Sequence, residues 1–345
     1  MNSIANVAIH ASQFPENVRR DLLTSLRTRR VNHKFHYDSV KQAQKWLALH
    51  EAHSPARYDK DCLATYDHAF IEAAAQIKSR RVHVIGLGCG GGQKDVQLLK
   101  LLQARRRKIS YTPCDVSTAM TLVARKAALK ILPAKKCFPF VCDLATAGDL
   151  PVTFNSRFTI HDPRLLTFFG MIPNFEPQVI LPKLASLIRP KDYLLFSANL
   201  APGKNYAAGV RKVLPQYDNP ATHDWLLTFL LDLGIERGDG ELRFAIETGG
   251  LGLKRIVARF YFSRRSRIHI ESESFEFRRG ESIRLFFSYR YTPALVRKNL
   301  ERHNLKILDQ WMTQSGEEGV FLVRVPRQSA AFEGNQRRST ETPLC

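Results

Sequence analysis

The sequence predicts an α/β protein with a Rossmann-like, doubly wound parallel sheet and a second α+β region. Between about residues 81 and 200, short apolar strands alternate with helical patterns about every 30 residues, as in βαβ units. Residues 82–102, VHVIGLGCGGGQKDVQLLKLL, join an apolar run, a glycine-rich turn and a leucine-rich helical pattern, which is the order expected at a ligand-binding turn. After residue 200 the pattern changes to stretches in which polar and apolar residues alternate, and this alternation predicts antiparallel strands.

The chain is expected to begin with three helices. The first covers 16–30 and follows Pro15, a residue favoured at the first helical position. The second covers 39–51. The third covers 61–80, where apolar residues recur at helical spacing.

The parallel sheet follows these helices. Strands are predicted at 81–88, 108–117, 137–144 and 192–200, and the stretches 157–162 and 165–173 continue the same pattern. Helices are predicted at 93–105, 118–131 and about 177–189.

The second half is predicted to start with a loop at 201–209 and a helix at 222–234 that ends at Gly234. Strands are then expected at 254–263, 267–277 and 282–290, a helix at 292–304, and closing strands at 305–312 and 319–325. Residues 327–345 have little to bury and are expected to be disordered.

Composition favours a cytoplasmic protein. The first fifteen residues lack a secretory signal pattern, and no apolar stretch approaches the ~20 residues of a membrane span. The six cysteines form no C-x-x-C pair, so neither a disulfide framework nor a metal site is predicted. The net charge of +20 allows a nucleic-acid partner, but its basic clusters at 27–30, 104–108 and 263–267 lie far apart, which favours solvated faces.

The glycine turn indicates a nucleoside cofactor. Gly86, Gly88 and Gly91 satisfy the dinucleotide G-x-G-x-x-G spacing, so an NAD enzyme stays possible. A site for S-adenosylmethionine is the competing interpretation, with Gly88 and Gly90 around the amino-acid end of the cofactor. Two aspartates end successive strands and support a nucleoside of either kind: Asp115 could accept from ribose hydroxyls and Asp143 from the adenine amino group.

Several phrases then identify a family. The stretches KFHYD at 34–38, GLGCGGGQKD at 86–95, YTPCDVS at 111–117, FGMIPNF at 169–175, QYDN at 216–219 and SYRYT at 288–292 are similar, in order, to K-Y-F-Y-D, E-L-G-S-G-T-S-x-K-T, Y-x-P-V-D-V-S, L-G-S-x-I-G-N-F, A-Y-D-D and S-x-K-Y-T. The chain therefore resembles the histidine-specific N-methyltransferases of the ergothioneine pathway. These S-adenosylmethionine-dependent enzymes methylate an amino-acid α-amine.

The resemblance implies roles for matching residues. It implies cofactor contacts for Gly88, Gly90, Lys94 and Asp115 and a seat for the substrate amine at Asn174. For the remaining phrases it implies substrate contacts at Tyr37, Tyr217 and Ser288. Among these, Asn174 and Tyr37 are the residues expected to take part in catalysis.

The resemblance also implies an architecture. A class I methyltransferase domain would comprise 62–200 and 290–326, and a substrate-binding domain would comprise 16–61 and 201–289.

Departures from the family phrases fall mainly on the acceptor side. Phe286 replaces the family glutamate that binds the imidazole of histidine. A histidine substrate would then have a buried ring N–H without an acceptor, which costs about 1–3 kcal/mol of binding free energy. AHSPAR at 52–57 replaces E-Y-Y-P-T-R, so a substrate-contacting tyrosine is missing. Gly86 replaces the acid that opens the turn, and Asn199 replaces an aspartate.

The prediction is an S-adenosylmethionine-dependent N-methyltransferase for the amine of an amino acid or related small molecule other than histidine. Phe286 would contribute an apolar wall to the acceptor site. The alternatives are an RNA or protein methyltransferase, suggested by the charge, a binding protein that keeps the fold without the chemistry, and an NAD oxidoreductase.

Overall fold

A computed structural model of the chain describes residues 4–157 and 162–326. The tail predicted to be disordered and most of the stretch 157–162 lie outside the described residues.

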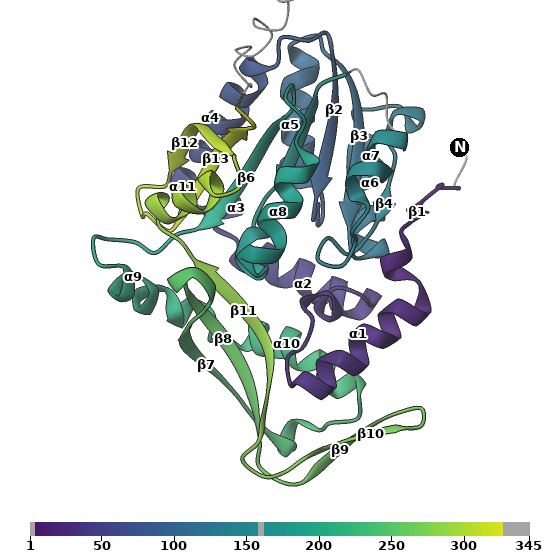
Figure 1. Cartoon of the computed structure of the whole chain (residues 1–345), viewed down its shortest axis with the longest axis vertical. Coiled ribbons are helices and arrows are strands. Elements are labelled where there is room, and N and C mark those ends of the chain that lie inside the picture. Colours follow the sequence, from purple (N-terminus) through teal and green to yellow (C-terminus); the bar gives the residue numbers. More distant parts are fainter. Residues whose placement is uncertain (1–3, 158–161, 327–345) are drawn as a thin grey trace, which may run out of the picture.

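An eight-stranded sheet forms the upper part of the molecule (Figure 1). Its order is β1 (Ala8–Ile9), β4 (Phe140–Val141), β3 (Lys108–Asp115), β2 (Arg81–Leu87), β5 (Arg164–Phe168), β6 (Tyr193–Asn199), β13 (Glu318–Arg324) and β12 (Lys306–Met312). The strands from β1 to β6 pair in parallel, and β13 runs antiparallel to both β6 and β12. The chain winds outward from β2 through β3 to β4 and then continues on the other side with β5, so the switch point of the sheet lies between β2 and β5.

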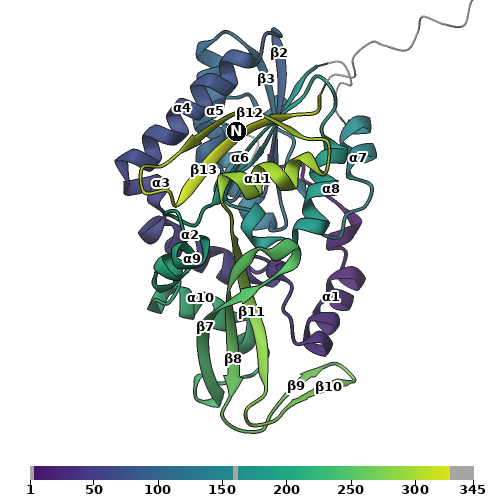
Figure 2. The ribbon, with the colours of Figure 1, turned by 60° about the vertical axis from the view of Figure 1, so that its left-hand side comes forward.

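Helices cover both faces of this sheet (Figure 2). One face packs on α4 (Lys60–Gln76), α5 (Gln93–Ala104) and α6 (Thr118–Ala128), and the other on α7 (Leu150–Arg157), α8 (Pro177–Leu187) and α11 (Pro293–Glu301). Consecutive side chains of a strand pack on opposite faces of the sheet. On β6, for example, Leu194 belongs to one hydrophobic cluster and Leu195 to the other.

A smaller antiparallel layer forms the lower part (Figures 1 and 2). It contains the sheet of β7 (Gly240–Thr248), β8 (Lys254–Phe262) and β11 (Ser282–Arg290), and the hairpin of β9 (Ser266–Ile270) and β10 (Glu273–Phe277). The further helices are α1 (Pro15–Thr28), α2 (Val40–His53), α3 (Pro55–Tyr58), α9 (Tyr206–Val213) and α10 (Pro220–Asp232). Short 3-10 helices are η1 (Ala11–Gln13), η2 (His33–His36), η3 (Ala134–Lys136), η4 (Ile172–Asn174), η5 (Leu214–Gln216), η6 (Arg237–Asp239) and η7 (Gly250–Gly252).

The chain leaves the large sheet after β6 and returns to it after β11 at the same place. Leu200 and Tyr291 form a β-bridge there. Ala201 N–H donates to the Tyr291 carbonyl at 2.8 Å, and Tyr291 N–H donates to the Asn199 carbonyl at 2.9 Å. The segment between Leu200 and Tyr291 is therefore an insertion whose two ends meet at this β-bridge, which we call the joint.

Several elements differ from the sequence prediction. The strand expected at 137–144 is reduced to Phe140–Val141. Pro139, which has no N–H to donate to the ladder, accounts for its late start. The single strand expected at 267–277 is a hairpin that turns at Glu271, which adopts φ of 52°. The loop expected at 201–209 contains the start of α9. Strands β1 and β7 and helix α7 were not predicted, and β1 adds to the large sheet from ahead of residue 16.

Candidate active site

A cavity of about 570 Å³ opens at the carboxyl ends of β2, β3, β4 and β5. This volume falls within the roughly 300–1,000 Å³ that small-molecule sites occupy. The sheet provides its floor through the loops after these strands. Side chains of η2, α2 and α3 line it from the smaller layer, and Figure 1 shows α2 below this end of the sheet.

The glycine turn after β2 is shaped by close neighbours. Gly88 adopts φ of +62°, and a Cβ there would lie 2.6 Å from Cγ of Met171. Gly90 adopts φ of +51°, and a Cβ there would lie 3.1 Å from Trp46. Both positions need the left-handed region and a missing side chain, so the backbone can approach a ligand closely.

Asp115, at the end of β3, fixes this turn. Its Oδ2 accepts the Gly90 N–H at 2.9 Å and its Oδ1 accepts the Ser117 N–H at 3.0 Å. Each carboxylate oxygen keeps a further lone pair for a ligand hydroxyl. Burial raises the pKa of Asp115 to about 6, against the opposing effect of these N–H donors.

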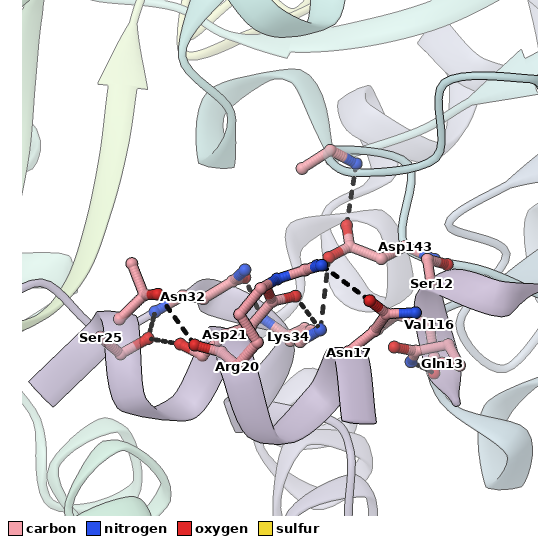
Figure 3. A network of polar contacts seen from close by, with 12 residues as sticks. Ser12, Gln13, Asn17, Arg20, Asp21, Ser25, Asn32, Lys34, Val116 and Asp143 are labelled. Carbon is pink, nitrogen blue, oxygen red and sulfur yellow. Dashed lines mark hydrogen bonds and ion pairs between the residues drawn. The ribbon is translucent and has the colours of Figure 1, made fainter. Parts of the chain in front are cut away.

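Asp143, after β4, also lines the cavity and is tied to the N-terminal helix by a buried lysine (Figure 3). Lys34 is fully buried; its Nζ lies 2.6 Å from Asp21 Oδ2 and 3.7 Å from Asp143 Oδ2. The Asp143 Oδ1 accepts the Ala145 N–H at 2.8 Å, whereas its buried Oδ2 accepts no hydrogen bond from the described residues. An acceptor with spare capacity stands where the adenine contact was predicted.

Asn174 and Tyr37 line the same cavity. Asn174 ends η4 after β5, and its backbone N–H donates to the Met171 carbonyl. Tyr37 follows η2 and packs edge-on against Trp46, with ring centroids 5.9 Å apart. Burial raises the pKa of Tyr37, so its hydroxyl stays protonated.

Three predicted substrate contacts lie outside the cavity lining. The Tyr217 hydroxyl donates to Ser288 Oγ at 3.0 Å and accepts from Arg290 at 2.8 Å. The buried ring of Phe286 packs between Tyr217 and Trp225. The substrate roles of Tyr217, Ser288 and Phe286 therefore stay predictions.

Other lining residues were not singled out from the sequence. His33 meets Phe175 edge-on at 4.5 Å, and burial lowers its pKa. Trp46 stacks on His50, whose pKa burial lowers to about 4. Arg57 and Asp95 also line the cavity. The phrase KFHYD, which follows His33 directly, was the only sequence feature that pointed to this part of the cavity. It does not predict that α2 packs against the cavity.

Lys94 lies in the first turn of α5, as the phrase predicts, and lines the cavity. Its Nζ donates to the Tyr66 hydroxyl at 2.6 Å and lies 3.9 Å from Glu318 Oε1. Burial lowers the pKa of Lys94.

Strand order and site together define the class of protein. The predicted site residues lie along the sheet edge in strand order: Asp143 after β4, Asp115 at the end of β3, the glycine turn after β2 and Asn174 after β5. The reversed β13 between β6 and β12 departs from the 3-2-1-4-5-6 order of dinucleotide-binding sheets. This is the arrangement of a Rossmann-like methyltransferase with a nucleoside cofactor.

Comparison with known proteins names the family. Residues 18–223 and 252–325 match the family described as histidine-specific, SAM-dependent methyltransferases. The chain belongs to this family and is an S-adenosylmethionine-dependent methyltransferase. It is 25% identical over 285 residues to the N-methyltransferase imqF of Aspergillus flavus, covering 79% of this chain and 74% of imqF.

Solved structures show more distant likenesses. The CcbJ methyltransferase from Streptomyces caelestis is 12% identical, with a TM-score of 0.38, over 76% of this chain and 95% of CcbJ. The mitomycin 7-O-methyltransferase MmcR is also 12% identical, with a TM-score of 0.40, over 91% of this chain and 70% of MmcR.

Within 4–157 and 162–326, no helix combines the length and apolar content that a bilayer crossing requires. In the same ranges no group of three or more histidine, cysteine, aspartate or glutamate residues is placed to hold a metal ion.

Proposed function

We propose that this chain methylates the amine of an amino acid or related small molecule whose side chain is less polar than that of histidine. One observation carries the proposal: Asn174 and Tyr37 share a single cavity with the glycine turn and Asp115. An amine held at Asn174 would therefore lie beside the cofactor rather than at a separate site.

The chemistry asks for positioning more than for acid–base catalysis. S-adenosylmethionine supplies a methyl group that its sulfonium already activates. The chain must hold a neutral amine with its lone pair aimed at that methyl group, and such alignment alone can lower the barrier by several kcal/mol. The Asn174 amide oxygen can accept an amine N–H without adding a charge that would keep the amine protonated. The neutral Tyr37 hydroxyl, which lines the same cavity, can donate to an acceptor carboxylate.

The surroundings of Asn174 support an acceptor of low polarity. Met171, Phe169 and Phe175 line the cavity close to Asn174 in the sequence, and His33 packs on Phe175. The lowered pKa of His33 keeps this imidazole neutral at physiological pH.

A panel assay tests the proposal. The full chain is incubated with methyl-labelled S-adenosylmethionine and free amino acids and biogenic amines, and products are read by mass, with Asn174→Ala as the matched control. We expect an N-methylated product from an amine with an aliphatic or aromatic side chain, and little from histidine. Histidine as the preferred acceptor would contradict the proposed specificity. Methylation of RNA or protein alone, or cofactor binding with no transfer to any amine, would contradict the proposed reaction.

A further inference from the structure

Two positions of the glycine turn have changed together. The family phrase E-L-G-S-G-T-S-x-K-T opens with an acid and closes with threonine, whereas GLGCGGGQKD opens with Gly86 and closes with Asp95. The carboxylate missing from the end of β2 therefore reappears nine residues later, in the first turn of α5.

The two positions share one space. A Cβ built on Gly86 would lie 2.1 Å from Asp95 Oδ2 and 3.1 Å from the Tyr111 hydroxyl. Such contacts are far inside van der Waals distance, so the Asp95 carboxylate fills the volume that a side chain at 86 would enter. The exchange is thus a relocation of the acid and not its loss.

Asp95 is held by two hydroxyl donors. Its Oδ2 accepts from the Tyr111 hydroxyl at 2.6 Å and its Oδ1 from Thr167 Oγ1 at 2.7 Å. Asp95 is 3% exposed, and burial raises its pKa against the opposing effects of the two hydroxyl donors and of the Lys94 charge. Among the described residues no cation lies within ion-pair distance of its carboxylate. A buried carboxylate is costly unless a positive charge pairs with it, and both Asp95 and Thr167 line the cavity.

We infer that Asp95 is the cofactor-binding carboxylate that replaces the family's strand-end acid, and that it pairs with the ammonium group of the methionine end of S-adenosylmethionine. Asp115 and Asp143 stand at the nucleoside side, after β3 and β4. Asp95 lies at the switch point instead, where it accepts a hydrogen bond from Thr167 of β5, near the glycines that are predicted to contact the amino-acid end of the cofactor. Tyr111 and Thr167 are positioning residues that orient it.

Calorimetry with two probes tests this assignment. S-adenosylhomocysteine carries the ammonium group, whereas methylthioadenosine has the same nucleoside and a thioether without the amino acid. Asp95→Asn keeps the size of the side chain, and the two hydroxyl partners can turn to suit an amide. We expect this variant to bind S-adenosylhomocysteine about tenfold or more weakly, because a charge-assisted contact is lost, with methylthioadenosine affinity unchanged. Unchanged binding of both probes, or an equal loss for both, would overturn the inference.

The relocation itself can be reversed. Gly86→Glu alone should lower the apo melting temperature and S-adenosylhomocysteine affinity, because its Cβ meets the Asp95 carboxylate. The double variant Gly86→Glu with Asp95→Thr restores the family arrangement and should recover both quantities toward wild type. Strictly additive losses in the double variant would show that the two positions do not share one role.

Discussion

Binding of the cofactor should release a proton from Asp115. Burial raises the pKa of this carboxyl from 3.8 to about 6 in the protein without ligand. At about 1.4 kcal/mol per pH unit, this difference of about two units means that ionising Asp115 costs about 3 kcal/mol more in the folded state than in the unfolded state. Because the folded pKa is raised, the stabilising contribution of Asp115 is fully present below pH 3.8 and is lost as the pH rises through about 6.

In the complex with the cofactor, Asp115 should instead prefer its ionised form, because ribose hydroxyls would donate hydrogen bonds to the carboxylate. The dissociation constant for S-adenosylhomocysteine should therefore rise toward tenfold per pH unit below about pH 6. Burial lowers the pKa values of the cavity histidines His33 and His50, the latter to about 4, so His50 stays neutral in this window. Asp115→Asn should weaken binding about 10- to 150-fold at pH 8, from one lost charged hydrogen bond of about 1.5–3 kcal/mol.

Titration calorimetry in two buffers of different ionisation enthalpy measures both effects. Wild type should show proton release near pH 6, and Asp115→Asn should release fewer protons, because only Asp95, whose pKa burial also raises, would remain. An affinity that stays flat from pH 8 to pH 5, or a variant that keeps the wild-type slope, would refute the linkage to this carboxyl.

Three other substitutions test separate parts of the molecule. Asn174→Ala should slow methyl transfer about 10²-fold while calorimetry finds S-adenosylhomocysteine affinity nearly unchanged; the opposite ranking would exclude Asn174 as the amine seat. Lys34→Met should lower the free energy of unfolding by about 3–5 kcal/mol in urea titrations, because Asp21 and Asp143 lose their cation, and a loss below about 1 kcal/mol would contradict this pairing. Phe286→Glu should lower the free energy of unfolding by about 3–5 kcal/mol, because the ring is buried. It should not create histidine turnover, because Phe286 lies outside the cavity lining. Histidine methylation above wild type would show that this position reaches the acceptor.

The nucleoside half of the site could be predicted from the sequence because it depends on local order along the chain. Parallel strands end at one edge of a sheet, so residues directly after β2, β3 and β4 must meet there. Asp115, Asp143 and the glycine turn follow this rule, and all line the cavity. Asn174 came from the family phrase rather than from the pattern, and it lines the cavity too.

The acceptor half could not be predicted in the same way. Trp46 and His33 reach the cavity only because α2 and η2 pack across the sheet edge, and that placement depends on contacts between distant segments. The stretch 201–209 was predicted as a loop, but Gly209 lies inside α9. A Cβ at Gly209 would come within 2.3 Å of the Pro202 carbonyl oxygen, so close packing of the preceding loop requires glycine there.

The joint at Leu200 and Tyr291 has an evolutionary consequence. Because the outgoing and returning strands are hydrogen-bonded neighbours, the segment between them can be lengthened, shortened or exchanged without moving the ends that the large sheet must accept. Selection can thus remodel this appendage, which carries β7, β8, β11 and Phe286, while the cofactor loops stay under separate constraint. Because no described residue of this segment lines the cavity, such changes would leave the cavity lining itself unaltered.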